Sequence, residues 1–346
     1  MEQPLRVINS AAPIRICDNG GWTDTWFAEH GQVFNIAVLP PAEVQIQVVP
    51  RAWHQNAERI MILAENYGDR YAPALGGAGW DRHPLLEATI QRMGIPDDVA
   101  LEVSIFSEAP SGASTGTSSA VTVALIGALD RLTPGRLTPH EAAQLAHSVE
   151  VDTLGQQCGI QDQFCAAYGG ISFIKILHYP QAVVSQLQVS DAIWWELERR
   201  LVLIYLGRSH SSSQVHEKVI QGLKNTGPAS RQLQDLRRAA ERSRNAVYAG
   251  DFQGLGQAMV ANTEAQGRLH PDLISAGARH VIEIAREHGA LGWKVNGAGG
   301  EGGSLTLLCG PLSAAKRAMI REIEQESELF RSIPIRLSRH GLNTWE

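Results

Sequence analysis

The feature that most constrains this chain is a run of small residues that leads into an apolar helix. Between Ser111 and Ser119 no side chain is larger than threonine, and the apolar segment Ala120–Leu129 follows at once. Glycine and serine leave backbone N–H groups uncovered, and a helix N-terminus adds unpaired N–H groups and the positive end of its dipole. With strand-like Val99–Phe106 before it, the stretch predicts strand, loop and helix around an anion site, most commonly one for phosphate.

Two familiar phosphate loops do not fit this stretch. A P-loop requires a lysine before its Ser or Thr, and no lysine lies between Ser107 and Leu132. A dinucleotide-binding loop requires glycines spaced G-x-G-x-x-G, and Gly112 and Gly116 do not have that spacing. A flexible Ser/Gly linker is the structural alternative, and the apolar helix that follows directly argues against it.

Composition limits the partners of the chain. Its 346 residues carry a net charge of −6, which offers no general attraction to nucleic acid or to an acidic membrane. No apolar run is long enough to span a bilayer, and the N-terminus lacks the apolar region of a signal peptide. These features predict a cytoplasmic protein with no nucleic-acid or membrane partner and leave its oligomeric state open. The cysteines lack metal-type pairing and are predicted to be reduced core residues: Cys17, Cys158, Cys165 and Cys309.

Hydrophobic periodicity and cap residues predict the remaining elements. Strand character covers Leu5–Ile16 and is interrupted at Pro13. A helix is predicted to begin near Pro139, with Thr138 as its N-cap. Further strands are predicted at residues 33–38, 42–49, 171–176, 201–206 and 333–337, and further helices at residues 83–93, 214–223, 230–249, 252–266, 271–288 and 316–326.

Residues 147–170 hold two acidic side chains of interest. Glu150 lies on the helix predicted from Pro139, and Asp162 lies between two glutamines before a small, apolar segment. An aspartate in such a setting is rarely buried without a partner. It is either a helix-capping residue or a chemical group, and the local sequence leaves both open.

Two glycine-rich turns carry the remaining candidates. Asp24 follows the turn Asn19–Gly21 and lies close to Trp22. This is an ordinary surface turn or a sugar site, in which the carboxylate accepts hydroxyl hydrogen bonds and the indole covers the ring. After Asn296, five of seven residues are glycine, which predicts a tight, exposed loop between two apolar strands. In isolation, such a loop is equally a flexible hairpin.

Two of these stretches resemble motifs of the GHMP kinases. The segment from Pro110 to Ala120 is similar to their nucleotide loop, P-x-G-x-G-L-G-S-S-x-A, with Ser114 where the second glycine is usual. The segment from Glu150 to Gln163 reproduces, without a gap, the pattern E-x4-G-x2-C-G-I-x-D-Q of galactokinases. The second match is the more specific, because it fixes chemistry-bearing residues at several defined offsets.

The two remaining turns resemble the outer motifs of the same family. Residues 20–24 carry the Gly-Gly-x-[ST]-Asp form of the branch that contains heptose 7-phosphate kinase and fucokinase. Galactokinases have Gly-Glu-His-x-Asp there, so galactose is disfavoured. The segment from Lys294 is similar to the third motif, K-[LVM]-[ST]-G-A-G-G-G-G, with Asn296 and Glu301 as departures.

The resemblance implies a fold and a reaction. The fold is the α/β (α+β) GHMP kinase fold with two lobes. Residues 1–180 would form a nucleotide-binding lobe similar to ribosomal protein S5 domain 2, with a left-handed βαβ crossover, and residues 181–346 an α+β C-terminal lobe. The reaction is ATP-dependent transfer of the γ-phosphate to a hydroxyl of a sugar or sugar phosphate, with ATP and Mg2+ as cofactors.

The resemblance also implies roles for residues. Asp162 would orient the acceptor hydroxyl and accept its proton late in the transfer, while Arg15 would pair with Asp162 or with the moving phosphoryl group. Ser118 and Glu150 would ligate Mg2+. ATP would be bound by Pro110, Gly112, Ser114, Gly116, Thr117, Ser118 and Ser119, and the substrate by Gly21, Trp22, Asp24, Gly297 and Gly299.

Several points stay open at this stage. A catalytically weak nucleotide- or sugar-binding regulatory protein on the same scaffold is the alternative function. Glu301 either points outward or touches the sugar. A Ser-rich turn after the strand at 201–206 contains His210, which touches a ligand or is a surface residue. A phosphorylated acceptor would need extra cations, for which the candidates are Arg208, Lys175, Lys294 and Arg268.

Overall fold

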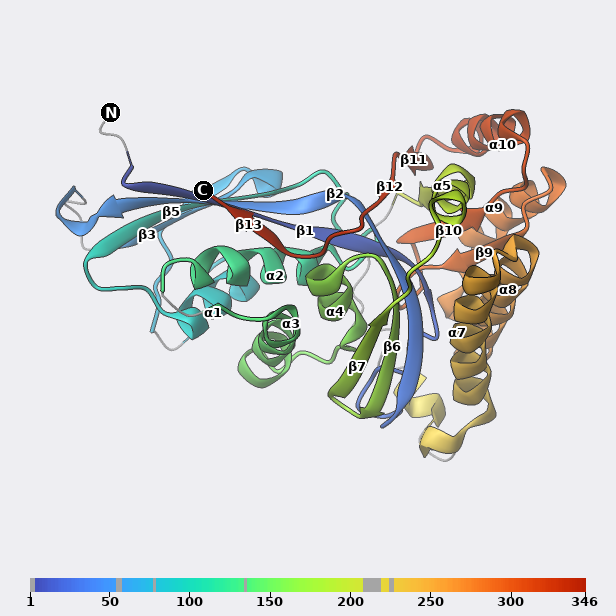
Figure 1. Cartoon of the computed structure of the whole chain (residues 1–346), viewed down its shortest axis with the longest axis horizontal. Helices are drawn as coiled ribbons and strands as arrows, with labels where there is room; N and C mark the ends of the chain where they lie inside the picture. The colour runs from blue at the N-terminus through green and yellow to red at the C-terminus, as the bar shows by residue number, and fades with distance from the viewer. Residues whose placement is uncertain (1–3, 54–57, 77–78, 134–135, 208–218, 224–226) are drawn as a thin grey trace.

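Two sheets form the framework of the molecule (Figure 1). The computed structural model describes residues 4–53, 58–76, 79–133, 136–207, 219–223 and 227–346. The strands in these residues are β1 (Arg6–Asn19), β2 (Gly31–Pro50), β3 (Ile60–Ala64), β4 (Asp69–Tyr71), β5 (Val99–Ser107), β6 (Ile171–His178), β7 (Gln181–Gln186), β8 (Leu201–Tyr205), β9 (Gly292–Val295), β10 (Ser304–Leu308), β11 (Arg331–Ile333), β12 (Arg336–Leu337) and β13 (Asn343–Trp345).

The larger sheet has nine of these described strands and the smaller has four. The path of the larger sheet is β13-β1-β2-β5-β3-β4, with β12 and β6 also paired to β2 and β7 paired to β6. Its pairs are antiparallel except for β3 and β5, which run parallel. The smaller sheet has the order β11-β8-β10-β9 and is antiparallel throughout.

The two long strands β1 and β2 run further than the sequence predicts. The predicted interruption of β1 at Pro13 is wrong, because the ladder shifts register between Ala12 and Ile14 and so needs no N–H from the proline. β2 joins the strands predicted at 33–38 and 42–49 through the cis peptide Leu39–Pro40. The strand predicted at 333–337 is divided into β11 and β12. The large sheet contributes Arg15 of β1, Ala64 of β3 and Ser107 of β5 to the cavity described below.

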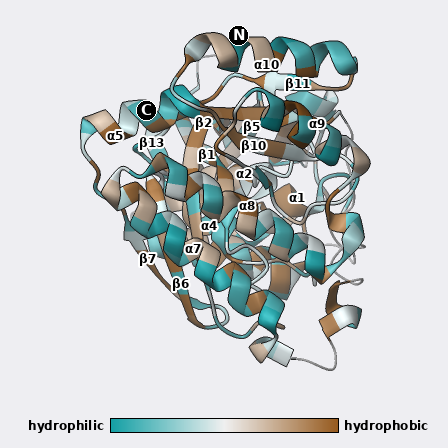
Figure 2. Ribbon diagram, turned by 90° about the vertical axis from the view of Figure 1, so that its right-hand side faces the viewer, coloured by the Kyte–Doolittle hydropathy of each residue, from teal (hydrophilic) through white to brown (hydrophobic). Residues whose placement is uncertain are grey.

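The predicted helices within the described residues are mostly present, but the helices Gln161–Tyr168 and Asp191–Arg200 were not predicted. The helix predicted at 271–288 begins at Ala276, after a 3-10 turn at Pro271–Leu273. Thr138 caps its helix in a capping box with Glu141, as expected, and Ser230 caps another. Figure 2 shows hydrophilic and hydrophobic residues alternating along the helices, as expected when one face meets the core. No helix in the described ranges is both long and apolar enough to cross a membrane. The helices are α1 (Pro84–Met93), α2 (Thr117–Asp130), α3 (Pro139–Ser148), α4 (Gln161–Tyr168), α5 (Asp191–Arg200), α7 (Arg231–Ala249), α8 (Phe252–Leu269), α9 (Ala276–Glu287) and α10 (Ser313–Glu326).

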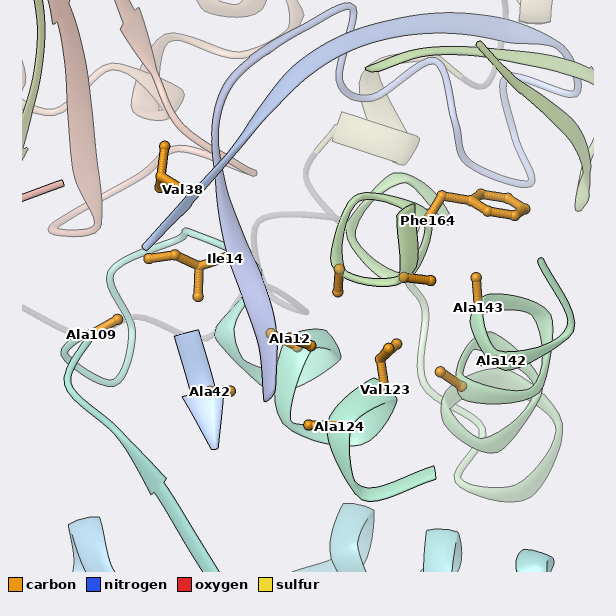
Figure 3. Close-up of a cluster of buried hydrophobic side chains, with 14 of the residues drawn as sticks. Ala12, Ile14, Val38, Ala42, Ala109, Val123, Ala124, Ala142, Ala143 and Phe164 are labelled. Atoms are coloured by element: carbon orange, nitrogen blue, oxygen red, sulfur yellow. The ribbon is translucent and has the colours of Figure 1, made fainter. Parts of the chain in front are cut away.

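Small residues bring the helices of the N-terminal half close to the large sheet. α2 packs against β1, β2 and α4, and α3 packs against α4. Figure 3 shows Val123 and Ala124 of α2 near Ala12 of β1, with Ala142 of α3 and Phe164 of α4 beside them. These side chains are buried in one cluster. Alanine at such contacts lets α2 approach the sheet closely, which fixes the position of the loop that precedes it.

Strand pairing crosses the division predicted at residue 180. β7 pairs with β6, and the last strands, β12 and β13, return to pair with β2 and β1 (Figure 1). One buried cluster also crosses this division, because Leu203 of β8 and Met259 of α8 belong to the cluster that contains Val123, whereas Ile204 and Leu305 of the smaller sheet belong to a separate cluster. The division into two lobes stays a prediction, and the end of the chain belongs to the first sheet.

Candidate active site

One cavity of about 540 Å³ gathers residues from all the motifs that the sequence singles out. Its wall is formed by the loop before α2, the end of β1, the segment before and within α4, and the loop after β9. Three predicted site residues, Pro110, Gly21 and Gly299, do not line it. The predicted residues that do line it are Arg15, Trp22, Asp24, Gly112, Ser114, Gly116, Thr117, Ser118, Ser119, Glu150, Asp162 and Gly297.

The loop before α2 turns its backbone sharply beside the cavity. Gly112, Ser114 and Gly116 all have positive φ, at 75°, 56° and 70°. Ser114 therefore adopts the left-handed conformation that favours glycine, which fits the glycine usual at this position in the family motif. Gly116 is the N-cap of α2, so the unpaired N–H groups of Thr117–Ser119 come directly after the loop. Loop and helix end together have the backbone geometry expected of the anion site that the sequence predicts.

Arg15 and Asp162 form a bidentate ion pair in the cavity wall. Nε donates to Oδ1 at 2.8 Å and Nη2 donates to Oδ2 at 3.2 Å, while Nη1 donates to the carbonyl of Ser114. The arginine side chain is 5% exposed and the aspartate side chain 26%. Burial lowers the pKa of Arg15, but the charges of Asp162 and Asp18 outweigh it and raise the pKa overall. Arg15 is thus held as a cation that orients the more accessible carboxylate.

Glu150 is a buried carboxylate on a π-helical turn, Val149–Thr153, that continues α3. Its Oε1 accepts hydrogen bonds from Gln163 Nε2 at 2.7 Å and Ser119 Oγ at 3.2 Å. Burial, with the nearby charge of Asp162, raises the pKa of Glu150 to about 7. A cation beside Glu150 would stabilise the ionised form of its side chain, so this carboxylate is suited to be a metal ligand.

Asp24 is a second buried carboxylate, and it follows the glycine turn at the end of β1. It is 2% exposed, and its Oδ2 accepts the backbone N–H of Gln161 at 3.1 Å. Burial raises the pKa of Asp24 to about 6, and the charge of Asp162 adds to this rise. A Cβ at Gly159 would lie 2.1 Å from Asp24 Oδ2, so only glycine fits there. Asp24 is therefore buried, which excludes the ordinary surface turn considered for it.

Trp22 contributes less open surface than a sugar platform would need. It lines the cavity but is 5% exposed. It belongs to a buried cluster with Leu233 and Leu269, and its ring lies 6.2 Å from that of Phe27, centroid to centroid. Gly21 lies behind it, where a Cβ would meet Asp18 Oδ2 at 2.9 Å. The first motif thus offers the carboxylate of Asp24 more directly than an aromatic face.

The loop after β9 is packed, and the prediction that it is exposed is wrong for most of its length. Gly297 is half-buried and donates its N–H to both carboxylate oxygens of Asp18, at 3.0 and 3.2 Å. Gly299 is buried, and a Cβ there would lie 2.3 Å from the carbonyl oxygen of Leu273. Glu301 is exposed and is not part of the cavity wall. The glycines here serve close packing, and the acidic departure from the family motif faces outward.

The cations considered for a phosphorylated acceptor do not converge on the cavity. Lys294 Nζ lies 3.1 Å from Asp18 Oδ1 in a pair with almost no exposed surface. Lys175 is exposed on β6, and Arg268 bonds to Asp235 at 3.1 Å. Arg208 lies outside the described residues, as do His210 and the start of the helix predicted at 214–223. None of the three described candidates lines the cavity.

Part of the cavity wall comes from a segment that carries no sequence motif. The hydroxyl of Tyr67 forms a hydrogen bond with Ser111 Oγ at 3.2 Å, at the start of the loop that precedes α2, which is called the first loop below. The side chain of Asn66 bonds to both the N–H and the carbonyl of Ser107, at 2.8 and 2.7 Å. Arg82 and His83 also line this end of the cavity. These four residues lie in turns and coil between β3 and the start of α1. Such segments have no hydrophobic periodicity or motif spacing, so the sequence did not predict that they line the cavity.

Comparison with known families decides the identity of this domain. Residues 84–170 match the family described as GHMP kinases N terminal domain. The chain carries a GHMP kinase N-terminal domain. The matched span begins with α1 and ends after α4, so it contains the first loop, Glu150 and Asp162. The GHMP kinase resemblance of the sequence motifs is therefore confirmed.

Individual relatives extend the similarity beyond this domain. D-glycero-alpha-D-manno-heptose 7-phosphate kinase of Campylobacter jejuni is 24% identical over 240 residues, with 69% of each chain covered. The bifunctional fucokinase/GDP-fucose pyrophosphorylase of Arabidopsis thaliana is 26% identical over 312 residues, which cover 85% of this chain and 29% of that enzyme. A mevalonate kinase of Thermococcus sibiricus is 34% identical over 209 residues, 58% of this chain and 57% of that enzyme.

Solved structures share the fold along nearly the whole chain. A D-glycero-D-manno-heptose 1-phosphate kinase from Bacteroides thetaiotaomicron has a TM-score of 0.74 and 21% identity, covering 98% of this chain and 99% of that one. The galactokinase of Lactococcus lactis has a TM-score of 0.71 and 15% identity, covering 99% of this chain and 95% of that one. The chain thus has the two-sheet α/β fold of the GHMP kinases throughout.

Proposed function

We propose that this protein is an ATP-dependent kinase that transfers the γ-phosphate to a hydroxyl of a sugar or a sugar phosphate. The observation that carries the proposal is the Arg15–Asp162 ion pair, which lies next to the N-terminus of α2 in one cavity with Glu150. A Cβ at the N-cap residue Gly116 would lie 3.1 Å from Asp162 Cγ, so the acidic group is in contact with the phosphate loop. Phosphoryl transfer needs this proximity of donor and acceptor groups.

The phosphates of ATP would bind the first loop and the N-terminus of α2. Gly112, Ser114 and Gly116 turn the backbone there, and the N–H groups of Thr117–Ser119 are free of helical partners. Such N–H groups and the helix dipole favour negative charge, including the charge that spreads over the equatorial oxygens during transfer. Pro110 would shape the loop from outside the cavity lining.

Mg2+ fits the oxygen groups of this site, with Glu150 and Ser118 as its ligands. Glu150 is a buried carboxylate whose partners in the described part of the chain include the neutral side chains of Gln163 and Ser119, and burial raises its pKa to about 7. Within the described residues no group of three or more His, Cys, Asp or Glu side chains forms a ready metal cage. That suits Mg2+, which is usually held by one or two carboxylates together with substrate phosphates. When bound, the ion would neutralise phosphate charge; Ser119 and Gln163 would orient Glu150.

The acceptor hydroxyl would lie against Asp162. Arg15 holds both oxygens of this carboxylate, so Asp162 orients the hydroxyl and accepts its proton late in the transfer rather than removing it beforehand. Asp24 would accept a hydrogen bond from another hydroxyl of the sugar. Gly297 would border the acceptor, whereas Gly21 and Gly299 would support the site from behind. A cytoplasmic location remains a prediction, consistent with the free cysteines.

The experiment that tests the proposal is ADP release from MgATP with a panel of acceptors. The relatives suggest heptose 7-phosphate, fucose and galactose, with mevalonate and homoserine as acceptors from other branches. Activity with one sugar, and a phosphorylated product identified by mass spectrometry, is the expected result. Binding of ATP and a thermal shift with one of the sugars, but no transfer to that sugar, would favour the regulatory binding protein instead.

A further inference from the structure

A row of four charges of alternating sign extends from the cavity into the interior. Asp162 is bonded to Arg15 at 2.8 Å, and Asp18 is bonded to Lys294 at 3.1 Å. The two pairs are coupled, because the charge of Asp18 raises the pKa of Arg15. Only the first member of the row is open to solvent: Asp162 is 26% exposed, whereas Asp18 and Lys294 are at most 1% exposed. Arg15 therefore lies between two carboxylates and bonds to one of them.

The geometry around Lys294 is that of a charged ammonium group. Its Nζ has acceptors in Asp18 Oδ1 at 3.1 Å, Gln266 Oε1 at 3.2 Å and the carbonyl of Val295. Three acceptors match the three N–H groups of an ammonium. Burial lowers the pKa of Lys294, and Asp18 opposes that effect. The inner pair is thus a satisfied ion pair at the junction of β1, α8 and β9.

The inner pair also fixes a peptide that lies close to Arg15. Asp18 accepts the N–H of Gly297 at 3.0 Å, and Gln266, which bonds to Lys294, donates to the carbonyl of Gly297 at 3.1 Å. A Cβ on Gly297 would lie 3.3 Å from Arg15 Nη2 and 3.1 Å from the Cβ of Ser114. The third motif is therefore held against both the arginine and the first loop.

Charge balance explains why Arg15 stays with Asp162. A buried carboxylate without a cation is strongly unfavourable and takes the nearest one available. Without Lys294, Arg15 is a described cation close enough to act on Asp18: the charge of Asp18 already raises the pKa of Arg15, and both groups lie beside Gly297. The guanidinium would then be shared between Asp18 and Asp162, and its two bonds to Asp162 would be lost or lengthened.

We propose that Asp18 and Lys294 form a positioning pair, which neutralises Asp18 and so reserves Arg15 for Asp162. Neither residue touches the cavity, so both act through Arg15 and the Gly297 peptide. The proposal concerns the orientation of the acceptor-binding carboxylate and rests on the function proposed above. It assigns a catalytic consequence to the lysine of the third motif, where the sequence suggested contact with a substrate phosphate.

The test is a double-substitution cycle on the full chain. Lys294→Met should lower kcat by about 10²-fold, as small misplacements of catalytic groups do, and leave the KM for ATP nearly unchanged. Asp18→Asn should cost less, because the remaining lysine repels Arg15 toward Asp162. The double variant Asp18→Asn with Lys294→Met should recover most of the kcat lost in Lys294→Met, because no unpaired charge remains.

A matched control separates positioning from loss of stability. Lys316 is a half-buried lysine, bonded to the carbonyls of Arg199 and Leu201 and not part of the cavity wall. Lys316→Met should lower the melting temperature without changing kcat per folded molecule. If Lys294→Met behaves in the same way, or if the double variant is no better than Lys294→Met, the positioning role is wrong.

A crystal structure of Lys294→Met makes the result independent of the kinase assignment. Arg15 should turn toward Asp18 and lose at least one of its two bonds to Asp162. An unchanged Arg15–Asp162 pair would overturn the proposal even in a protein that shows no transfer to any acceptor. Should this variant not fold, Asp18→Glu, which keeps the charge and displaces the carboxylate, should lower kcat with Arg15 displaced in its structure; retained kcat and geometry would count against the proposal.

Discussion

The loops at residues 111–116 and 297–303 are both made of small residues and glycines, but they have different roles in the structure. The first loop, at residues 111–116, contributes every one of its residues to the cavity wall, and most of them retain some solvent exposure. The third loop, at residues 297–303, contributes only Gly297 and Ala298, and beyond these it is buried except for Glu301. One loop is open to a ligand, and the other is a packed support for the groups that face the ligand.

The difference lies in what stands opposite each glycine. At Gly116 the nearest atoms to an added Cβ belong to the side chain of Asp162, which faces the cavity. At Gly299 the nearest atom is the main-chain carbonyl oxygen of Leu273, which also accepts the N–H of Gly300 at 2.9 Å. A cluster of glycines therefore indicates that another atom approaches the backbone closely. The folded structure is needed to tell whether that atom belongs to a ligand-facing side chain or to the protein's own backbone.

The largest effect is expected from Gly299→Ala. Its φ is +76°, and the new Cβ would lie 2.3 Å from the Leu273 oxygen. A left-handed alanine and a backbone overlap should together reduce the free energy of unfolding by about 3 kcal/mol or more. Urea denaturation measures this change. The matched control is Gly289→Ala, with φ of +72° and no atom within 4 Å, which should lose only about 1–2 kcal/mol. Equal losses in both variants would contradict the supporting role of the third loop.

Gly116→Ala should damage activity more than stability. Its φ is +70°, and the Cβ would press on Asp162 Cγ at 3.1 Å, so the carboxylate must move. We expect kcat to fall by about 10- to 100-fold, with a stability loss no greater than that of Gly289→Ala. Steady-state kinetics together with urea denaturation measure both quantities. Retention of full kcat would show that the loop does not set the position of Asp162.

Asp24→Asn should separate ligand binding from stability, with a pH dependence of known sign. Because the pKa of Asp24 is raised from 3.8 to about 6, its stability contribution is present at low pH and lost as pH rises through 6. The asparagine variant should therefore melt at a higher temperature than the native protein at pH 8, and the difference should shrink below pH 6. The KM for the sugar should rise by about 10-fold. A lower melting temperature at pH 8 would mean that Asp24 is stabilised by a partner.

Glu301→Gln should have the smallest effect. Glu301 is exposed and lies outside the cavity wall, although it departs from the family motif. We expect kcat and both KM values to change by less than about twofold, as for other exposed positions. Steady-state kinetics with ATP and sugar varied in turn would check this. A large change in the KM for either substrate would mean that the third loop opens toward the ligand during turnover.

Local sequence rules predicted the elements that depend on neighbouring residues. The helix beginning at Pro139 has the Thr138 cap that the sequence indicates, because a capping box is complete within four residues. The interruption at Pro13 was predicted wrongly, because the register shift that accommodates it depends on a strand 25 or more residues away. Local signals could not contain that information.

The site residues also divide into those that a motif predicts and those that depend on contacts between distant parts of the chain. The Arg15–Asp162 pair joins residues 147 positions apart, and it was predictable only through the roles that the resemblance to a known family implies. Tyr67 and His83 carry no such motif and were not predicted. Lys294 was visible in the third motif and Asp18 in none, and their pairing depends on how β1 meets β9, which spacing along the chain does not encode.

The most direct test of the central claim is single-turnover transfer from radiolabelled MgATP to the active sugar in Asp162→Asn. The substitution keeps the size of the side chain. It removes the carboxylate that orients the acceptor hydroxyl and accepts its proton. The account predicts a rate at least about 10³-fold below that of the native protein, with ATP affinity nearly unchanged. Transfer at the native rate would contradict the account and remove Asp162 from the mechanism.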